Sequence, residues 1–186
     1  MGFRDRRRER REERELFGRD GDADRYQLRQ KVLSIGDDYW IEDAEGRRVF
    51  RVDGKALRIR HTLDLEDVEG TRLCRIQTRL MHLRDTMDIE DPDGHRIARV
   101  HKALITPLRD RWKVDVEAGP DLRISGNVID HEYEIEIEDE DRKIAEISKK
   151  WFRLRDTYGV QIEPTQDREL ILAVTIAVDA MVHPSK

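Results

Sequence analysis

The sequence predicts an all-β fold with one helix: a twelve-stranded, closed antiparallel β-barrel around a central, apolar C-terminal α-helix. Three observations lead to this prediction. Hairpin-like units repeat about every 24 residues, their strands alternate apolar and polar residues, and a segment near the C-terminus is apolar on every side.

Glycines mark the repeat. Four of them recur at intervals of 24 or 25 residues in turn-like contexts: Gly46, Gly70, Gly94 and Gly119. Each of the first three follows an apolar-Glu-Asp segment such as Leu65–Asp67. Because glycine adopts positive φ without steric cost, each of the four is expected to form a tight turn between two strands.

The segments between the turns have the period of two that is typical of half-buried strands. In residues 83–90, Leu83, Met87 and Ile89 share one face and charged residues the other. Similar strands are expected at residues 59–66, 108–116, 133–138 and 154–162. Six units of two strands each make twelve strands. Closure removes the exposed edges, and it leaves a lumen too wide for the wall side chains to fill.

The apolar segment near the C-terminus is suited to fill that lumen, because a helix that is hydrophobic on all sides is buried in a core or a membrane. From Leu170 to Val182 it has 13 residues and is interrupted by Asp179. A membrane-spanning helix needs roughly 20 apolar residues. We therefore expect a plug helix inside the barrel and no transmembrane span.

The limits of this helix and of the domain follow from the flanking residues. The plug helix is expected at about residues 167–182, with Gln166 or Asp167 as its N-cap and Pro184 as its stop. The barrel domain as a whole is expected to occupy residues 25–186.

Composition narrows the classes of partner. The 186 residues contain 36 Lys and Arg against 41 Asp and Glu, so the net charge of −5 offers no global attraction for nucleic acid, and none is expected as a partner. Cys74, the single cysteine, excludes an internal disulfide and a cysteine-based zinc cluster. No secretory signal or N-myristoylation motif is found. A cytoplasmic location is expected.

Several stretches of this chain resemble the LURP-one-related family, whose fold belongs with the tubby C-terminal domain and the phospholipid scramblases. The most specific are residues 130–135, residues 148–152 followed by 156–160, and the apolar helix with Asp179. The resemblance runs from about residue 26 to 182 and implies a twelve-stranded, tubby-like barrel around a helix. Tubby-like relatives bind phosphoinositides and scramblases act on lipids, but no motif carries those lipid sites onto this chain residue by residue.

Signatures of catalysis are absent, so a non-enzymatic protein is expected, with no catalytic residue, cofactor or metal ion. The sequence has no glycine-rich phosphate loop, no GxSxG elbow and no HExxH helix. Cys74 occupies the strand position that Phe50, Ala98 and Ala145 occupy in other repeats, which indicates a core residue. The acidic turns are not EF-hands, because the first ligand position would fall on Ile41, Leu65 and Ile89.

One position of the repeat always holds a titratable residue, two residues before an inward-facing Tyr, Leu, Met or Trp. The set is Asp37, His61, Asp85, Asp110, His131 and Asp156. These side chains are expected near one mouth of the barrel, as an inward polar ring that binds a cation or a polar headgroup or responds to pH. Alternatively, they hydrogen-bond backbone groups where strands begin.

The connections beside that mouth mix basic with apolar or aromatic side chains. The candidate lipid-binding or ligand-binding residues are Arg79, Met81, His82, Lys102, Lys149, Lys150, Trp151, Phe152 and Arg153. Basic residues attract anionic lipids and aromatic rings sit at the headgroup level, so the cluster fits a peripheral membrane site. Alternatively, the apolar members cap the barrel and the Lys and Arg stems extend outward.

The N-terminal tail, residues 1–24, mixes seven arginines with acidic residues between Arg4 and Arg14 and is expected to be disordered. Three functions remain open. The first is a binding or scaffold module for anionic phospholipid headgroups or a membrane surface. The second is a protein interaction or structural module that contacts a partner through the arginine-rich tail, and the third is scramblase-like lipid handling.

Overall fold

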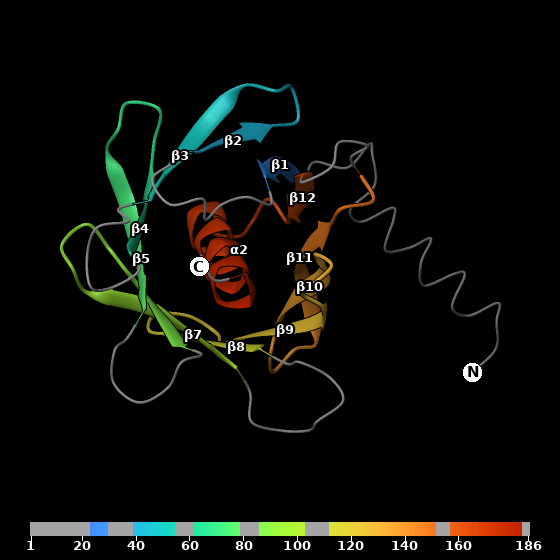
Figure 1. Ribbon diagram of the computed structural model, residues 1–186. Helices are drawn as coiled ribbons and strands as arrows, with labels where there is room; N and C mark the ends of the chain where they lie inside the picture. The colour runs from blue at the N-terminus through green and yellow to red at the C-terminus, as the bar shows by residue number, and fades with distance from the viewer. Residues whose placement is uncertain are drawn as a thin grey trace.

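The computed structural model describes residues 23–29, 39–54, 62–78, 86–102, 112–151 and 157–183, and it confirms the predicted fold class. Twelve antiparallel strands form a closed barrel, and one helix of the described chain, α2, lies in the middle of the ring (Figure 1). Neighbouring strands follow one another in sequence, and the pairing of the first strand with the last closes the barrel.

The strands are short and similar in length, as expected for a repeated hairpin. In chain order they are β1 (Asp24–Arg29), β2 (Tyr39–Asp43), β3 (Arg48–Gly54), β4 (Thr62–Glu66), β5 (Arg72–Thr78), β6 (Thr86–Glu90), β7 (Arg96–Lys102), β8 (Trp112–Val116), β9 (Leu122–Asn127), β10 (Glu132–Ile137), β11 (Arg142–Ser148) and β12 (Thr157–Ile162), followed by α2 (Arg168–Val182).

The repeat is built on one local hydrogen-bonding unit. Asp43 Oδ1 accepts hydrogen bonds from the backbone N–H groups two and four residues ahead, at 3.0 and 2.9 Å. Asp67 and Asp91 accept the same pair of bonds in the next two hairpins. Three of the four predicted turn glycines have positive φ: Gly46, Gly70 and Gly94. The Asp therefore fixes the turn and the glycine completes it.

The prediction of a positive φ at Gly119 is wrong, because its φ lies outside the left-handed region. Gly119 precedes Pro120, and the residue before a proline is restricted toward extended backbone. Gly126 in β9, which the sequence did not single out, has a φ of 127°, and a Cβ there would lie 2.6 Å from the carbonyl oxygen of Glu132. The close approach of β10 thus requires glycine at this position.

The core lies between the inward faces of the strands and α2. The ten residues from Ile171 to Ala180 are buried on all sides of the helix. Asp167 is the N-cap, and its side chain accepts hydrogen bonds from the N–H groups of Glu169 and Leu170. Gln166 is not the cap, and Pro184 lies outside the described residues. Complete burial of each large aliphatic side chain stabilises the fold by about 1.5–3 kcal/mol, so the helix contributes much of the core.

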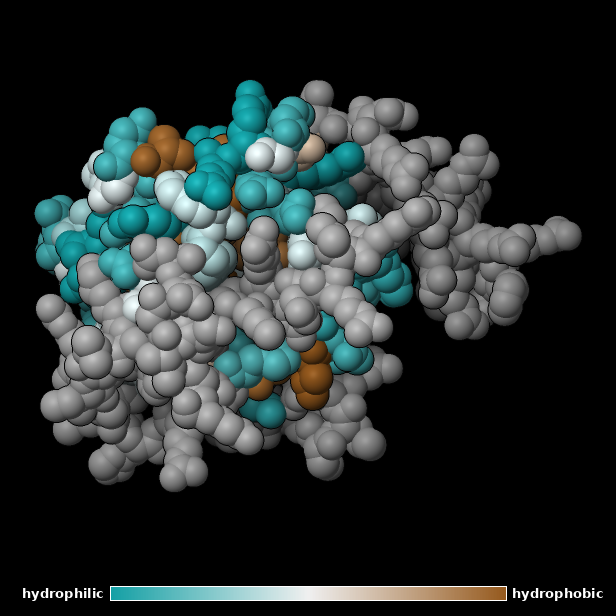
Figure 2. Space-filling model, turned by 45° about the horizontal axis from the view of Figure 1, so that its top comes forward, coloured by the Kyte–Doolittle hydropathy of each residue, from teal (hydrophilic) through white to brown (hydrophobic). Residues whose placement is uncertain are grey.

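The outer face uses the charged residues in cross-strand ion pairs. The pairs include Arg51–Glu66, Arg75–Asp64, Arg99–Asp88 and Arg123–Glu136. On the face that Figure 2 presents, the described residues form a mainly hydrophilic surface, with hydrophobic residues in small separate groups. The arginines are partly exposed, whereas the carboxylates of Asp64 and Glu66 are buried, and each pair links two neighbouring strands and so supports their register.

The two mouths of the barrel differ in construction. We call the end at which α2 begins the proximal mouth, and it carries the turns at residues 44–47, 67–71, 91–95, 117–121 and 138–141. We call the end at which α2 terminates the distal mouth. Its described connections are the turn at residues 128–131 and residues 149–151 after β11.

Candidate functional site at the distal mouth

The described members of the predicted cationic and aromatic cluster all lie at the distal mouth. Lys102 is the last residue of β7, and Lys149, Lys150 and Trp151 directly follow β11. The topology brings both strand ends to the same mouth. The remaining members lie outside the described residues: Arg79, Met81, His82, Phe152 and Arg153.

Two exposed hydrophobic side chains mark this mouth. Trp151 is 42 % exposed and Ile129, in the turn between β9 and β10, is 57 % exposed. Among the described residues, one further large hydrophobic side chain is exposed, Val68 at the proximal mouth. Sequence reasoning did not identify Ile129. The sequence signal that could have identified it is an aliphatic residue within a polar turn, because a turn residue does not pack against the inward face of the sheet.

The turn that carries Ile129 is held by its own polar residues. Asn127 Oδ1 accepts a hydrogen bond from the Asp130 N–H at 3.1 Å, and Asn127 Nδ2 donates to Asp130 Oδ2 at 2.6 Å. The N–H of His131 donates to the carbonyl of Val128 at 3.3 Å. Ile129 is therefore presented to solvent by a fixed turn and not by a loose segment.

Glu132 anchors the segment that carries the lysines. Its Oε1 accepts hydrogen bonds from the hydroxyl of Ser148 at 2.9 Å and the N–H of Lys149 at 3.1 Å, and its Oε2 pairs with Lys150 Nζ at 2.8 Å. The charge of Lys150 is thus partly neutralised within the protein. Lys102 places Nζ 5.9 Å from the ring centroid of Trp112, a cation–π contact at the same mouth.

One member of the predicted polar ring is described, and it lies at the distal mouth. His131 is buried, and its Nε2 lies 2.7 Å from Oδ1 of Asp179 on α2. Its side chain therefore contacts a carboxylate 48 residues away rather than a nearby backbone group. The other five positions lie outside the described residues, so the ring stays a prediction: Asp37, His61, Asp85, Asp110 and Asp156.

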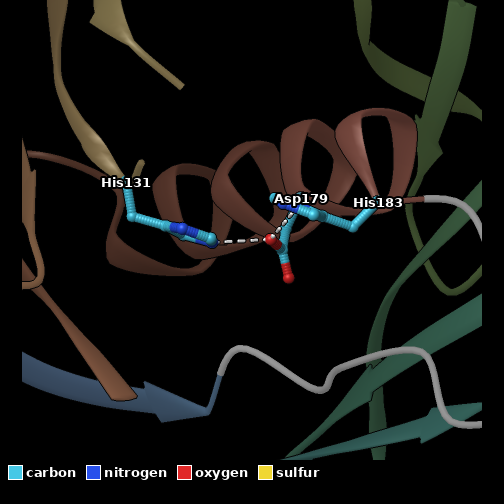
Figure 3. Close-up of side chains that lie close together, drawn as sticks. All are labelled: His131, Asp179 and His183. Atoms are coloured by element: carbon cyan, nitrogen blue, oxygen red, sulfur yellow. Dashed lines mark hydrogen bonds and ion pairs between the residues drawn. The ribbon is translucent and has the colours of Figure 1, made fainter. Parts of the chain in front are cut away.

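A second histidine approaches the same carboxylate. His183, the C-cap of α2, places Nδ1 3.3 Å from Oδ1 of Asp179. Figure 3 shows both imidazoles close to the Asp179 carboxylate, and the two rings stack, with centroids 5.4 Å apart and planes inclined by 11°. The backbone of His131 has a φ of 51°, which non-glycine residues rarely adopt and which is common at functional sites.

Three tyrosines surround this cluster from the barrel wall. Tyr39, Tyr133 and Tyr158 are buried, and no described residue forms a hydrogen bond with the hydroxyl group of Tyr39 or Tyr158, whereas that of Tyr133 lies beside Thr175. Burial raises the pKa of each phenol, and the negative charge of Asp179 raises it further. The distal end of the lumen is therefore polar and poorly satisfied, which is unusual for a protein core.

The proximal end of the lumen shows no comparable chemistry in the described chain. Cys74 is a buried core residue, as predicted, and burial raises the pKa of its thiol to about 12. A thiol with this pKa stays protonated near neutral pH and is a poor nucleophile. Asp91, Asp93 and His95 come close together in the turn after β6, but Asp93 and His95 are exposed and Asp91 already accepts the bonds of its turn.

A twelve-stranded antiparallel barrel filled by its own C-terminal helix, with a polar cluster where that helix ends, defines the structural class of the protein. Within this class, the LURP-one-related (LOR) family matches residues 25–179, and the chain belongs to that family. The X-ray structure of the Arabidopsis thaliana protein AT5G01750 is similar, with a TM-score of 0.66, 16 % identity and coverage of 87 % of this chain and 92 % of that one. That likeness shows the fold alone.

No curated protein matches the sequence. In the described part of the chain, no helix has both the length and the hydrophobicity required to cross a bilayer.

Proposed function

We propose that the protein is a non-enzymatic, cytoplasmic binding module that docks peripherally on membranes rich in anionic phospholipid, through the distal mouth. One observation carries the proposal. Two of the three exposed large hydrophobic side chains in the described chain, Ile129 and Trp151, flank β10 at this mouth, next to Lys149 and Lys150.

This combination matches the two forces that hold peripheral proteins on membranes. An aromatic ring and an aliphatic side chain enter the headgroup region, while each lysine near an anionic surface adds about 1 kcal/mol. Because Lys150 is paired with Glu132, the apolar pair supplies most of the affinity and the lysines supply the preference for anionic lipid. Such binding weakens as salt screens the charges.

Co-sedimentation with vesicles tests the proposal. The full-length protein is expected to bind vesicles of phosphatidylcholine with phosphatidylserine, and to bind phosphatidylcholine alone more weakly. Ile129→Asn with Trp151→Ala should abolish binding, and Lys149→Glu with Lys150→Glu should remove the preference for phosphatidylserine. Val68→Asn, at an equally exposed site on the proximal mouth, is the matched control and should bind like the wild type.

The ion pair allows a test in the opposite direction. Glu132→Gln removes the charge that neutralises Lys150 while it keeps an oxygen that accepts the bonds from Ser148 and Lys149. One released charge worth about 1 kcal/mol should strengthen binding to phosphatidylserine vesicles about fivefold. No gain, with the lysine variants also unchanged, would show that this segment does not face the membrane.

The other candidate functions correspond to other outcomes. Wild-type protein that ignores anionic vesicles even at low salt refutes the membrane proposal and leaves a protein partner, bound through the arginine-rich tail, as the next candidate. Binding accompanied by exchange of labelled lipid between vesicle leaflets would instead support scramblase-like lipid handling.

A further inference from the structure

We propose that His131, Asp179 and His183 form a binding site for one divalent transition-metal ion of the zinc class at the distal end of α2. Each residue offers one ligand atom, and these atoms lie within 4.8 Å of one another. Zinc–nitrogen and zinc–oxygen bonds of about 2.0–2.2 Å place neighbouring ligands slightly more than 3 Å apart, so small side-chain rotations complete the site.

The donor set selects the class of metal. Two imidazole nitrogens with one carboxylate oxygen suit zinc and neighbouring first-row metals, whereas calcium and magnesium prefer oxygen ligands. A site with three protein ligands leaves a further position for water or a substrate atom. The hydroxyl groups of Tyr39 and Tyr158, which no described residue hydrogen-bonds, lie near Asp179 and offer partners to such a water.

A structural hydrogen bond alone does not account for the geometry. The contact between His131 and Asp179 would be sufficient to fasten α2 to the β9–β10 turn. His183 Nδ1 nevertheless lies 3.3 Å from the same oxygen without meeting hydrogen-bond geometry, and the second oxygen, Oδ2, has no partner among the described residues. One imidazole nitrogen that is hydrogen-bonded to the carboxylate and a second that approaches the same oxygen without hydrogen-bond geometry are arranged as ligands of a shared ion.

Burial strengthens the case. The carboxylate of Asp179 is 1 % exposed, and a buried carboxylate is costly unless charge and hydrogen bonds compensate it. A divalent ion supplies that compensation. His183 is 33 % exposed, so the site has a side that an ion can reach from solvent.

The sequence contained no metal motif for this site. His131 and Asp179 are separated by 48 residues, and only the position of α2 inside the barrel brings them into contact. Asp179 and His183 have the i, i+4 spacing of ligands on neighbouring turns of a helix, but this pair of residues alone is not a recognised metal motif such as HExxH.

Metal titration of tag-free, chelator-treated full-length protein tests the inference. Calorimetry should show one equivalent of Zn²⁺ bound, and Co²⁺ should give the visible absorption bands of a site with four or five ligands. His183→Gln, at a part-exposed position after the helix, should weaken Zn²⁺ binding at least about tenfold and reduce the Co²⁺ bands. Asp179→Asn should do the same.

The exposed group in the turn after β6 provides the matched control. His95 lies beside Asp91 and Asp93 in an arrangement that could attract metal weakly, so His95→Gln should leave the one-equivalent site unchanged. Zn²⁺ should raise the Tm of the wild type and of His95→Gln by the same amount, and at the same concentration it should raise the Tm of His183→Gln less.

Three results would overturn the inference. These are a wild type that binds no Zn²⁺, binding that persists at full strength in His183→Gln, and a site that prefers Ca²⁺ to Zn²⁺. If Asp179→Asn fails to fold, His183→Gln decides alone, because its side chain is not part of the core.

Discussion

The two mouths of the barrel satisfy their polar groups in opposite ways. At the proximal mouth, Asp43, Asp67 and Asp91 bond to backbone groups two and four residues away, so each turn is complete by itself. At the distal mouth, His131 and Asp179 depend on each other across 48 residues, inside the core. The first arrangement maintains the fold, and the second collects buried polar atoms at one place, which is the property of a binding site.

The largest effect is expected where charge enters the hydrophobic core. Ala177 is fully buried on α2 within the hydrophobic core, and Ala177→Asp should destabilise the protein by at least about 3 kcal/mol, because it buries a carboxylate in the core. Urea unfolding measures the loss. Val68→Asp at the exposed proximal turn is the control and should change stability by less than about 0.5 kcal/mol. A cooperative, stable Ala177→Asp protein would mean that α2 is not the core of the barrel.

Alanine substitutions of one glycine near each mouth should differ in their effect on stability, because the backbone requires glycine at Gly126 and not at Gly119. Gly126→Ala places a Cβ 2.6 Å from the Glu132 carbonyl at a φ of 127°, so it should cost about 1–3 kcal/mol. Gly119→Ala meets Val116 Cγ1 at an ordinary 3.4 Å without a left-handed φ, and it should be close to neutral. Thermal unfolding of the two variants side by side checks the difference, and equal losses would contradict it.

The self-contained turns should each make a modest contribution. Asp67→Ala removes two hydrogen bonds to backbone N–H groups that are exposed and can bond to water instead, so the loss should be about 1 kcal/mol. Glu69→Ala in the same turn is the control, with an expected change near zero. Chemical denaturation of both variants provides the measurement. A loss several times larger for Asp67→Ala would show that the turns are coupled to the core.

The smallest effect, in the mildly alkaline range, concerns the buried thiol of Cys74 near the proximal mouth. The pKa of Cys74 is about 12 in the folded state against an ordinary value of 9.0, so the folded protein keeps its proton while the unfolded chain releases it above about pH 9. Stability should therefore fall as pH rises from 9 towards 12, by slightly less than 1 kcal/mol at about pH 9.5. In Cys74→Ala, the loss of stability above about pH 9 should be smaller by this amount. Identical pH profiles for the two proteins would show that the thiol is accessible and not buried.

The features that the sequence predicts well are those with local causes. Strand alternation and the spacing of Gly46, Gly70 and Gly94 were sufficient for the barrel, because each hairpin encodes its own turn and its own buried face. The prediction of a positive φ at Gly119 was wrong because Pro120 restricts the backbone of the residue before it toward extended conformations. The requirement for glycine at position 126 arises from the close approach of β10 to the backbone of β9, and the residues around Gly126 in the sequence do not indicate that distance.

The candidate site was only partly predictable for the same reason. His131 was identified from its repeat position, but its partner was not, because contact with Asp179 depends on the direction of α2 through the lumen. Asp179 was noted as an interruption of an apolar helix, and His183 was not noted at all. The exposure of Ile129 could not be predicted from strand alternation, because this residue lies in a turn that hydrogen bonds between Asn127 and Asp130 hold in place.

The pairing of β1 with β12, from Asp24 opposite Ile162 to Arg29 opposite Thr157, has a consequence for biosynthesis. The ring cannot close until the last strand has left the ribosome, and the helix that fills it follows later still. During translation the growing sheet therefore has two open edges and an unfilled apolar face, which are the features that promote aggregation of nascent chains. We expect the charged side chains on the outer face of the strands to oppose such aggregation, so they would act before the native ion pairs form.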